Sequence, residues 1–288
     1  MKKILMTLTL ALGCAFFFGT SVCVAGVVKE NRETGTFRMI SVGGGIDVYF
    51  TQDDSLSLVV EADEDLIGKI VTEVRGETLV INIINKWKDK LKFTSLFSKD
   101  RVLKVYVSSP TLEKVNVSGG ADFYMDNLEC GSSFELKVSS GSDVHIKNIA
   151  ANGDADISAS AGADVTINNL TVAGNANVSA SAGTDVTINN LAVAGNTNIS
   201  ASGGVDCDVN NLQTVNCSLS ATGGSDLNIN LAVSGNLEAA ASGGVDINIS
   251  GTAGDVKLSA SGGSDIDIRK MSYKNIDIQT SGTSDVHR

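Results

Sequence analysis

The sequence is poor in basic residues, proline and tryptophan. Its 288 residues include 22 Lys and Arg against 33 Asp and Glu, which gives a formal net charge of −11, with one proline (Pro110) and one tryptophan (Trp87). Residues 148–256 contain no Lys or Arg at all, but ten Asp or Glu. A nucleic-acid site needs clustered cations to bind phosphates, so the composition excludes nucleic acid as a partner.

Histidine is equally scarce, and this limits the chemistry that the chain can perform. The two histidines are His145, at an outward strand position, and His287, close to the last residue. No Ser-His-Asp or Cys-His set can be assembled from motifs of this sequence. We therefore predict no catalytic, cofactor-binding or metal-binding residues, and no cofactor.

Residues 1–25 have the features of a secretory signal. Lys2 and Lys3 precede an apolar run over residues 4–19, and the segment ends in small residues at Ala25. The run is too short for a stable transmembrane anchor. We expect cleavage after Ala25 and export to the periplasm, outer membrane or cell surface, with no transmembrane segment in the mature chain. Lipidation at Cys14 is the alternative.

The rest of the chain is built on a repeat whose marker is an Asp after a Gly- or Ala-rich corner. The spacing between successive markers is 19–21 residues, as expected of a solenoid whose units bury their apolar side only against their neighbours. The marker positions are Asp122, Asp143, Asp164, Asp185, Asp206, Asp226, Asp246, Asp265 and Asp285.

Each unit consists of strands rather than helices. In residues 164–168 (DVTIN) and 177–181 (NVSAS), apolar residues alternate with polar ones, which is the period of a β-strand. Gly and Asn dominate the corners, where a positive φ is often needed. The pattern places these side chains inside the fold: Val165, Ile167, Val178, Val186, Ile188 and Ile199.

Such units stack in parallel, so that each strand pairs with the same strand one coil further on, about 4.8 Å away. We predict an all-β, single-domain, right-handed parallel β-helix from about residue 34 to 286, with rungs of about 20 residues. The nearly identical blocks 158–178 and 179–199 then stack like side chains on each other. Residues 26–118 are predicted to be the less regular N-terminal part, with a cap over the first open edge, and residues 119–288 the regular repeats.

Three segments of the N-terminal part form a recognisable set. They are SVGGGIDVYFTQDDSLSLVVEADEDLIGKI (41–70), GETLVINI (76–83) and LKVYVSSPTLEKVNVSGGADF (103–123). The set resembles the auto-transporter adhesin head domain, or "head GIN" family, with Gly45-Ile46-Asp47 in place of Gly-Ile-Asn. The resemblance implies a β-helix-like fold in an envelope protein of Bacteroides-like bacteria, without catalytic residues. Auto-transport would need a C-terminal membrane barrel, which the sequence to Arg288 does not include, so we do not expect self-export.

The column of corner Asp residues is the sharpest candidate feature. Carboxylates in register about 5 Å apart repel by about 0.8 kcal/mol in water, so something should offset the repulsion. We expect each Asp to accept hydrogen bonds from the backbone N–H groups of its own corner. The alternative is calcium held between rungs. The pairs Asn168-Asn169, Asn189-Asn190 and Asn210-Asn211 are predicted to form a hydrogen-bonded ladder at one corner.

Three cysteines and one basic stretch complete the candidate features. Cys207 and Cys217 align with inward positions of the repeat, as does Cys130, so we expect buried free thiols. A Cys207–Cys217 bridge is the alternative. The stretch KWKDKLKF (86–93) reads as a solvated excursion whose Trp87, Leu91 and Phe93 cover a solenoid edge. Its alternative role is contact with an anionic surface or partner.

The leading functional hypothesis is a non-catalytic exported envelope or surface protein, adhesin-like, that presents a rigid polar face to surface glycans or host matrix proteins. One alternative is a carbohydrate-active β-helix enzyme, a polysaccharide lyase or hydrolase, that uses a pair from the Asp column. The other is a purely structural envelope component. A hydrolase needs two carboxylates in different environments, whereas these Asp residues are nearly equivalent, which argues against the enzyme.

Overall fold

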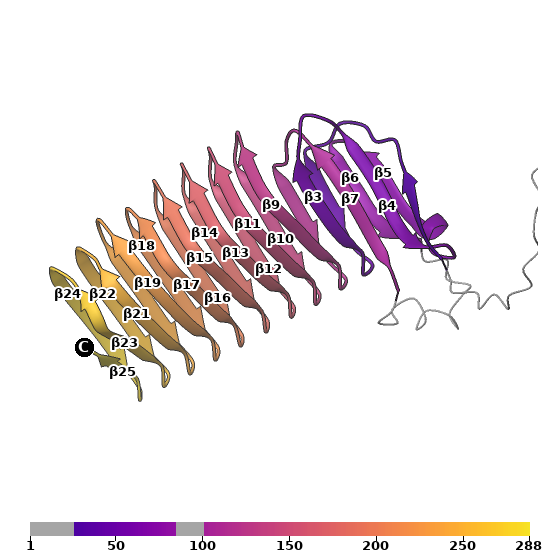
Figure 1. Ribbon diagram of the computed structural model, residues 1–288. Helices are drawn as coiled ribbons and strands as arrows, with labels where there is room; N and C mark the ends of the chain where they lie inside the picture. Colours follow the sequence, from indigo (N-terminus) through magenta and orange to yellow (C-terminus); the bar gives the residue numbers. More distant parts are fainter. Residues whose placement is uncertain (1–25, 85–100) are drawn as a thin grey trace, which may run out of the picture.

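The computed structural model describes residues 26–84 and 101–288. Its strands form two long sheets, which face each other across one continuous hydrophobic core (Figure 1). The expectations for residues 1–25, for Cys14 and for residues 86–93 lie outside the described residues. Within the two described stretches, no helix has the length and apolar character that a membrane crossing requires.

The two sheets hold nearly all of the regular structure. Sheet A has 13 strands in the spatial order β1 (Val27–Asn31), β4 (Ser57–Asp63), β7 (Leu103–Ser109), β3 (Asp47–Gln52), β9 (Asp122–Cys130), β11 (Asp143–Ala151), β13 (Asp164–Val172), β15 (Asp185–Val193), β17 (Asp206–Thr214), β19 (Asp226–Val233), β21 (Asp246–Thr252), β23 (Asp265–Ser272) and β25 (Asp285–His287). Sheet B has 12 strands in the order β24 (Asn275–Ser281), β22 (Asp255–Ser261), β20 (Leu237–Ser242), β18 (Cys217–Thr222), β16 (Thr197–Ser202), β14 (Ala176–Ser181), β12 (Ala155–Ser160), β10 (Phe134–Ser139), β8 (Lys114–Val117), β2 (Met39–Val42), β6 (Thr78–Ile83) and β5 (Ile70–Arg75).

From β8 onward the chain alternates between the sheets, one strand in sheet B and one in sheet A for each rung. Successive rungs pair in parallel and in register, so that Val165 lies opposite Val186 and Ile157 opposite Val178. The corner Asp residues from Asp122 to Asp285 are partners of one another along the whole stack. The predicted all-β solenoid, with rungs of about 21 residues, is confirmed.

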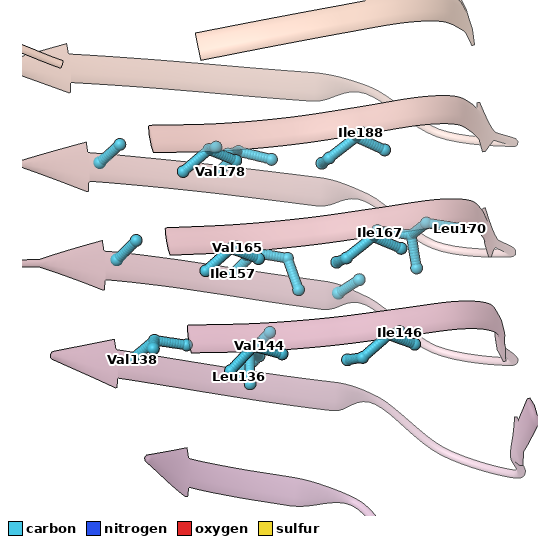
Figure 2. Close-up of a cluster of buried hydrophobic side chains, with 14 of the residues drawn as sticks. Leu136, Val138, Val144, Ile146, Ile157, Val165, Ile167, Leu170, Val178 and Ile188 are labelled. Carbon is cyan, nitrogen blue, oxygen red and sulfur yellow. The ribbon is translucent and has the colours of Figure 1, made fainter. Parts of the chain in front are cut away.

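The core lies between the sheets and is filled by the inward residues of the period-two pattern. Figure 2 shows how Val144, Ile146, Val165 and Ile167 point from one sheet toward residues of the other, such as Leu136. The six side chains predicted to be inside are each no more than 1% exposed: Val165, Ile167, Val178, Val186, Ile188 and Ile199.

The two corners of a rung have different requirements. The corner before β3 and before each sheet A strand from β9 to β23 holds two consecutive residues with positive φ, such as Gly203 (φ 80°) and Gly204 (φ 71°). In an earlier rung the first of these positions is Ala182, which has φ 58°. At the opposite corner, Gly174 packs on the rung before it so closely that a Cβ would lie 2.9 Å from the carbonyl carbon of Gly153. Glycine there permits the close stacking of rungs.

The N-terminal part differs from the expected continuous parallel winding. After the outermost strand β1, the chain forms β2 and β3, then moves outward to β4 and β5, and returns as β6 and β7. Strand β7 pairs in parallel with β3 but antiparallel with β4. The segment after β7 then crosses over to β8. Strand β8 pairs with β2 on the side of β2 that faces away from β6. The spatial order of the rungs is therefore not their sequence order.

The outermost strands at this end pair antiparallel, and we call them the cap strands. Antiparallel pairs β1–β4 and β5–β6 close this end of the two sheets, joined by the 3₁₀ turn η1 (Ile67–Lys69). Arg32 donates hydrogen bonds to the carbonyl oxygens of Ile70 (2.6 Å) and Ile67 (2.8 Å), and Arg101 pairs with Asp63 (3.1 Å) and Asp65 (2.6 Å). These charged contacts tie the outer strands of the two sheets to each other.

Candidate interaction surface

The outer face of sheet A carries columns of like side chains, because its strands pair in register. The first column is the set of corner Asp residues. The side chains of Asp122 and Asp143 are half-buried, and those from Asp164 onward are exposed. One side of the molecule therefore presents a continuous row of carboxylates along its length.

The hydrogen bonds expected for this Asp column are not the ones that form. At four of these corners the N–H of the residue before the Asp donates to a serine hydroxyl of the next rung, as in Ala121 N–H to Ser142 Oγ (3.2 Å). The N–H of the Asp itself donates to the previous rung, as in Asp164 to the Ser142 carbonyl (3.1 Å). The corner donors are thus already satisfied. The prediction that each carboxylate caps its own corner is wrong for the described residues.

The carboxylates of neighbouring rungs instead repel one another electrostatically. The pKa values of Asp143, Asp185 and Asp226 are raised above the ordinary value, first by partial burial and then by the neighbouring Asp of the column. Among residues 26–84 and 101–288, no three His, Cys, Asp or Glu side chains gather as a metal site would require. The Asp column is therefore a repulsive feature of the folded protein at neutral pH.

The predicted asparagine ladder is confirmed, although it lies within the sheet A strands rather than at a corner. The Nδ2 group of each Asn donates to the Oδ1 atom of the Asn one rung before, as in Asn169 to Asn148 (2.7 Å) and Asn190 to Asn169 (2.8 Å). We call the two parallel rows on β13, β15 and β17 the asparagine ridge: Asn168, Asn169, Asn189, Asn190, Asn210 and Asn211.

A column of aromatic rings on the first rungs was not predicted. The ring centroids of Tyr106 and Tyr49 are 5.1 Å apart, those of Tyr49 and Tyr124 4.8 Å, and those of Tyr124 and His145 5.4 Å. The rings stack face to face, so they present edges to solvent and leave few faces free for a ligand. The signal in the sequence was an aromatic residue two positions after Asp47, Asp122 and Asp143.

The tyrosine hydroxyls of this column remain protonated donors. Burial, followed by the hydrogen bond to Glu61 (2.9 Å), raises the pKa of Tyr106 to about 12. Burial, followed by the charge of Asp122, raises the pKa of Tyr124 to about 12. Lys29 and Lys104 lie over the rings of Tyr106 and Tyr49, at 5.4 Å and 5.8 Å from the centroids.

The cysteines are located as predicted, inside the core. Cys130, Cys207 and Cys217 are buried and free, so the alternative of a Cys207–Cys217 bridge is wrong. Burial raises the pKa values of Cys207 and Cys217 to about 12, which keeps both as thiols. They fill core positions equivalent to Val186 and Thr197 of the rung before.

Fold and surface together define a class: a capped, two-sheet β-solenoid with polar columns on its outer face. The model of the family "Putative auto-transporter adhesin, head GIN domain" matches residues 36–224 and 197–287. The chain belongs to this family, and the resemblance seen in residues 41–123 is confirmed. No curated protein matches the sequence.

Solved structures share the fold at low sequence identity. A "putative adhesin" from Parabacteroides merdae has a TM-score of 0.59 and 18% identity, over 90% of this chain and 98% of its own. A "putative adhesin" from Bacteroides fragilis has a TM-score of 0.53 and 17% identity, over 89% and 97%. A "putative lipid binding protein" from Parabacteroides distasonis has a TM-score of 0.53 and 14% identity, over 92% and 98%.

Proposed function

We propose that the protein is an exported, non-catalytic adhesin of the cell envelope, and that it uses the outer face of sheet A for shallow, multivalent contacts. The observation that carries this proposal is the register of sheet A, which repeats the same polar groups from rung to rung. A regular, rigid row of equal groups suits repeated weak contacts with a polymeric ligand. Surface glycans and host matrix proteins are ligands of this kind.

Export is supported by residues 1–25, which have the charge and apolar pattern of a secretory signal. N-terminal sequencing of the protein purified from its host tests it. A first residue at Gly26 is the expected result, whereas a lipid-modified Cys14 would show that the chain is anchored instead.

The adhesin proposal is tested by binding arrays of glycans and of host matrix proteins, run with the full chain immobilised at high density, with and without calcium. Liposomes form a further arm, because one structural neighbour is described as a lipid binding protein. The expected result is saturable binding whose apparent affinity falls as the density of the immobilised protein is lowered. Turnover in a parallel polysaccharide-degradation screen, abolished by one Asp substitution in the column, would favour the enzyme instead.

A further inference from the structure

A hollow opens on the outer face of sheet A where the asparagine ridge stops. Strand β19 has 8 residues against the 9 of β17, and the register between them shifts after Val209. Asn230 alone stands where β17 holds Asn210 and Asn211. The ridge therefore loses one of its two rows at β19.

The missing row of the ridge continues across β21 and ends at β23. On β21, Ser250 pairs with Asn230, and Gly251 lies opposite Leu231. A Cβ at Gly251 would lie 1.8 Å from the Leu231 carbonyl oxygen, so only glycine lets the backbone of β21 pass there. On β23 the register shifts back, and Lys270 pairs with Ser250. A second basic residue, Arg269, stands beside it.

The resulting depression has a volume of about 420 Å³, which lies in the range of small-ligand sites. It lies between Asn210 of β17 and Lys270 of β23, across three strand spacings or about 14 Å. Its floor is formed by the backbone over the buried side chains of Ile229 and Ile249. We call this depression the β19–β21 hollow.

The polar groups of the β19–β21 hollow are of two kinds. Asn228 donates to Asp208 (2.8 Å) and Asn248 donates to Asn228 (2.9 Å), as in the regular ridge, whereas other side chains of the hollow lack such bonds within the described part of the chain. Asn210 donates to Asn189 (2.8 Å), but among the described residues nothing donates to its own Oδ1 atom. Within the same residues, the side chains of Asn230, Ser250 and Lys270 make no hydrogen bond or ion pair. Arg269, on the same wall, is occupied by Asp267 at 3.0 Å. Carboxamide, hydroxyl and ammonium groups thus converge on one depression without partners.

We propose that the β19–β21 hollow binds a short, neutral, hydroxyl-rich segment of a glycan. A carboxamide offers both donors and an acceptor, which matches hydroxyl groups that donate and accept at once. The carboxylates of Asp226, Asp246 and Asp265 lie on the same face two residues before the hollow, and they disfavour a polyanion. This inference rests on the proposed function, because it gives the adhesin a defined glycan site within its polar face.

The expected affinity of one copy is weak, because no aromatic face lines the hollow and its depth is small. A dissociation constant on the order of 1 mM corresponds to a binding free energy of about −4 kcal/mol. Detection therefore relies on NMR of the labelled chain titrated with neutral trisaccharides: mannotriose, cellotriose, maltotriose and triacetylchitotriose. Shifts of side-chain amide signals confined to Asn210, Asn228, Asn230 and Asn248 are the expected result for at least one of them.

The decisive variant is Asn230→Ala combined with Ser250→Ala, which removes two free polar groups without touching the core. The matched control is Ser218→Ala with Ser220→Ala, on exposed positions of β18 in the opposite sheet. At least a ten-fold loss of affinity in the first variant, with none in the control, supports the inference. Equal binding by both variants, or no shift with any trisaccharide, overturns it.

The array of the proposed function separates the two claims. If the chain binds neutral glycans on the array and the hollow variant binds them as well as the wild type does, the inference fails and the adhesin remains. If the chain binds matrix proteins but no neutral glycan or trisaccharide, the inference fails and the adhesin again remains. If the wild type binds nothing in either experiment, both fail. If the wild-type array signal on neutral glycans disappears in the hollow variant alone, the hollow is the site through which the adhesin acts.

Discussion

The first rungs and the regular repeats use the same backbone stack with different side chains. In one core column, Phe123 of β9 is followed by Val144 and Val165 in the next two rungs. In a column of sheet B, Phe134 of β10 is followed by alanine on the next strand. On the outer face, the stacked aromatic rings that end at His145 give way to two threonines, then to Asp208 and then to asparagine. From β9 to β15 the register is constant while the core side chains of these two columns become smaller, and larger side chains return at Leu227 and Leu237.

This difference separates two sources of stability. The capped end has large buried side chains and charged contacts such as Arg101 with Asp65, as a globular domain has. The repeats depend on many small core residues, on glycine at close corners and on side-chain ladders between neighbouring rungs. The same kind of substitution should therefore have different costs in the two regions.

The largest expected effect is the loss of a core aromatic residue in the first rungs. Phe123→Ala removes a fully buried ring and is expected to lower the free energy of unfolding by about 3–5 kcal/mol. Val165→Ala, in the same column two rungs later, removes fewer buried atoms and should cost less. Denaturant unfolding measures both. Equal losses would mean that the two regions do not differ in how they use their core.

A corner glycine of the repeats should rank second. In Gly174→Ala the new Cβ would lie 2.9 Å from backbone atoms of Gly153, so the rungs must separate, at a cost of about 1–3 kcal/mol. Gly131→Ala, at the equivalent corner of the first rungs, meets no atom within 4 Å and serves as the control. Hydrogen exchange of β12 and β14 locates the damage. Unchanged protection there would contradict the close-stacking explanation.

Much of this architecture could be predicted from the sequence, because aligning the repeats shows which residues of neighbouring rungs pair. The spacing of the Asp markers fixed which strands pair, and the alternation around Val165 and Ile167 identified the core. The asparagine ladder followed from the same alignment. These predictions succeeded because each depends only on the nearest rung.

The predictions that failed concern strand order and hydrogen-bond partners, which the alignment of the repeats does not determine. The order in which β6 and β7 return outside β2 and β3 is a long-range choice with no local marker. The Asp carboxylates lost their expected donors because buried serines such as Ser142 took them. The only sequence signal of the β19–β21 hollow was a spacing of 20 or 19 residues between Asp markers in place of 21. This spacing shows that a rung has fewer residues, but it does not show where the outer face has a depression.

The third effect distinguishes the two regions by pH. The pKa of Asp185 is raised by burial and by Asp164 and Asp206, so the folded state binds this proton more readily than the unfolded state does. Its contribution to stability therefore improves as the pH falls through the raised pKa. Asp185→Asn should stabilise the chain at pH 7 by less than about 1 kcal/mol, and the gain should disappear in acid.

Glu135 of β10 provides the opposite case in the first rungs. Hydrogen bonds from Lys114 and then Lys137 lower the pKa of its carboxyl group, so its contribution is present at neutral pH and lost as the pH falls through the folded-state pKa. Glu135→Gln should destabilise at pH 7 by about 0.2–1 kcal/mol and have no effect in acid. Thermal unfolding at pH 3 to 8 measures both variants, and effects of the same sign would contradict the comparison.

The last prediction concerns a corner position that is alanine in one rung and glycine in the next. Ala182 has φ 58°, in the left-handed region that costs an alanine about 1–2 kcal/mol, whereas the next rung has Gly203 at the same position with φ 80°. Ala182→Gly relieves this strain but adds entropy to the unfolded chain, so a net gain of up to about 1 kcal/mol is expected. Gly203→Ala, whose Cβ would meet only ordinary contacts at 3.7 Å or more, should lose a similar amount. Calorimetry of the two variants and of their combination tests this, since the combination moves the strain from one rung to the next and should leave the stability close to that of the wild type.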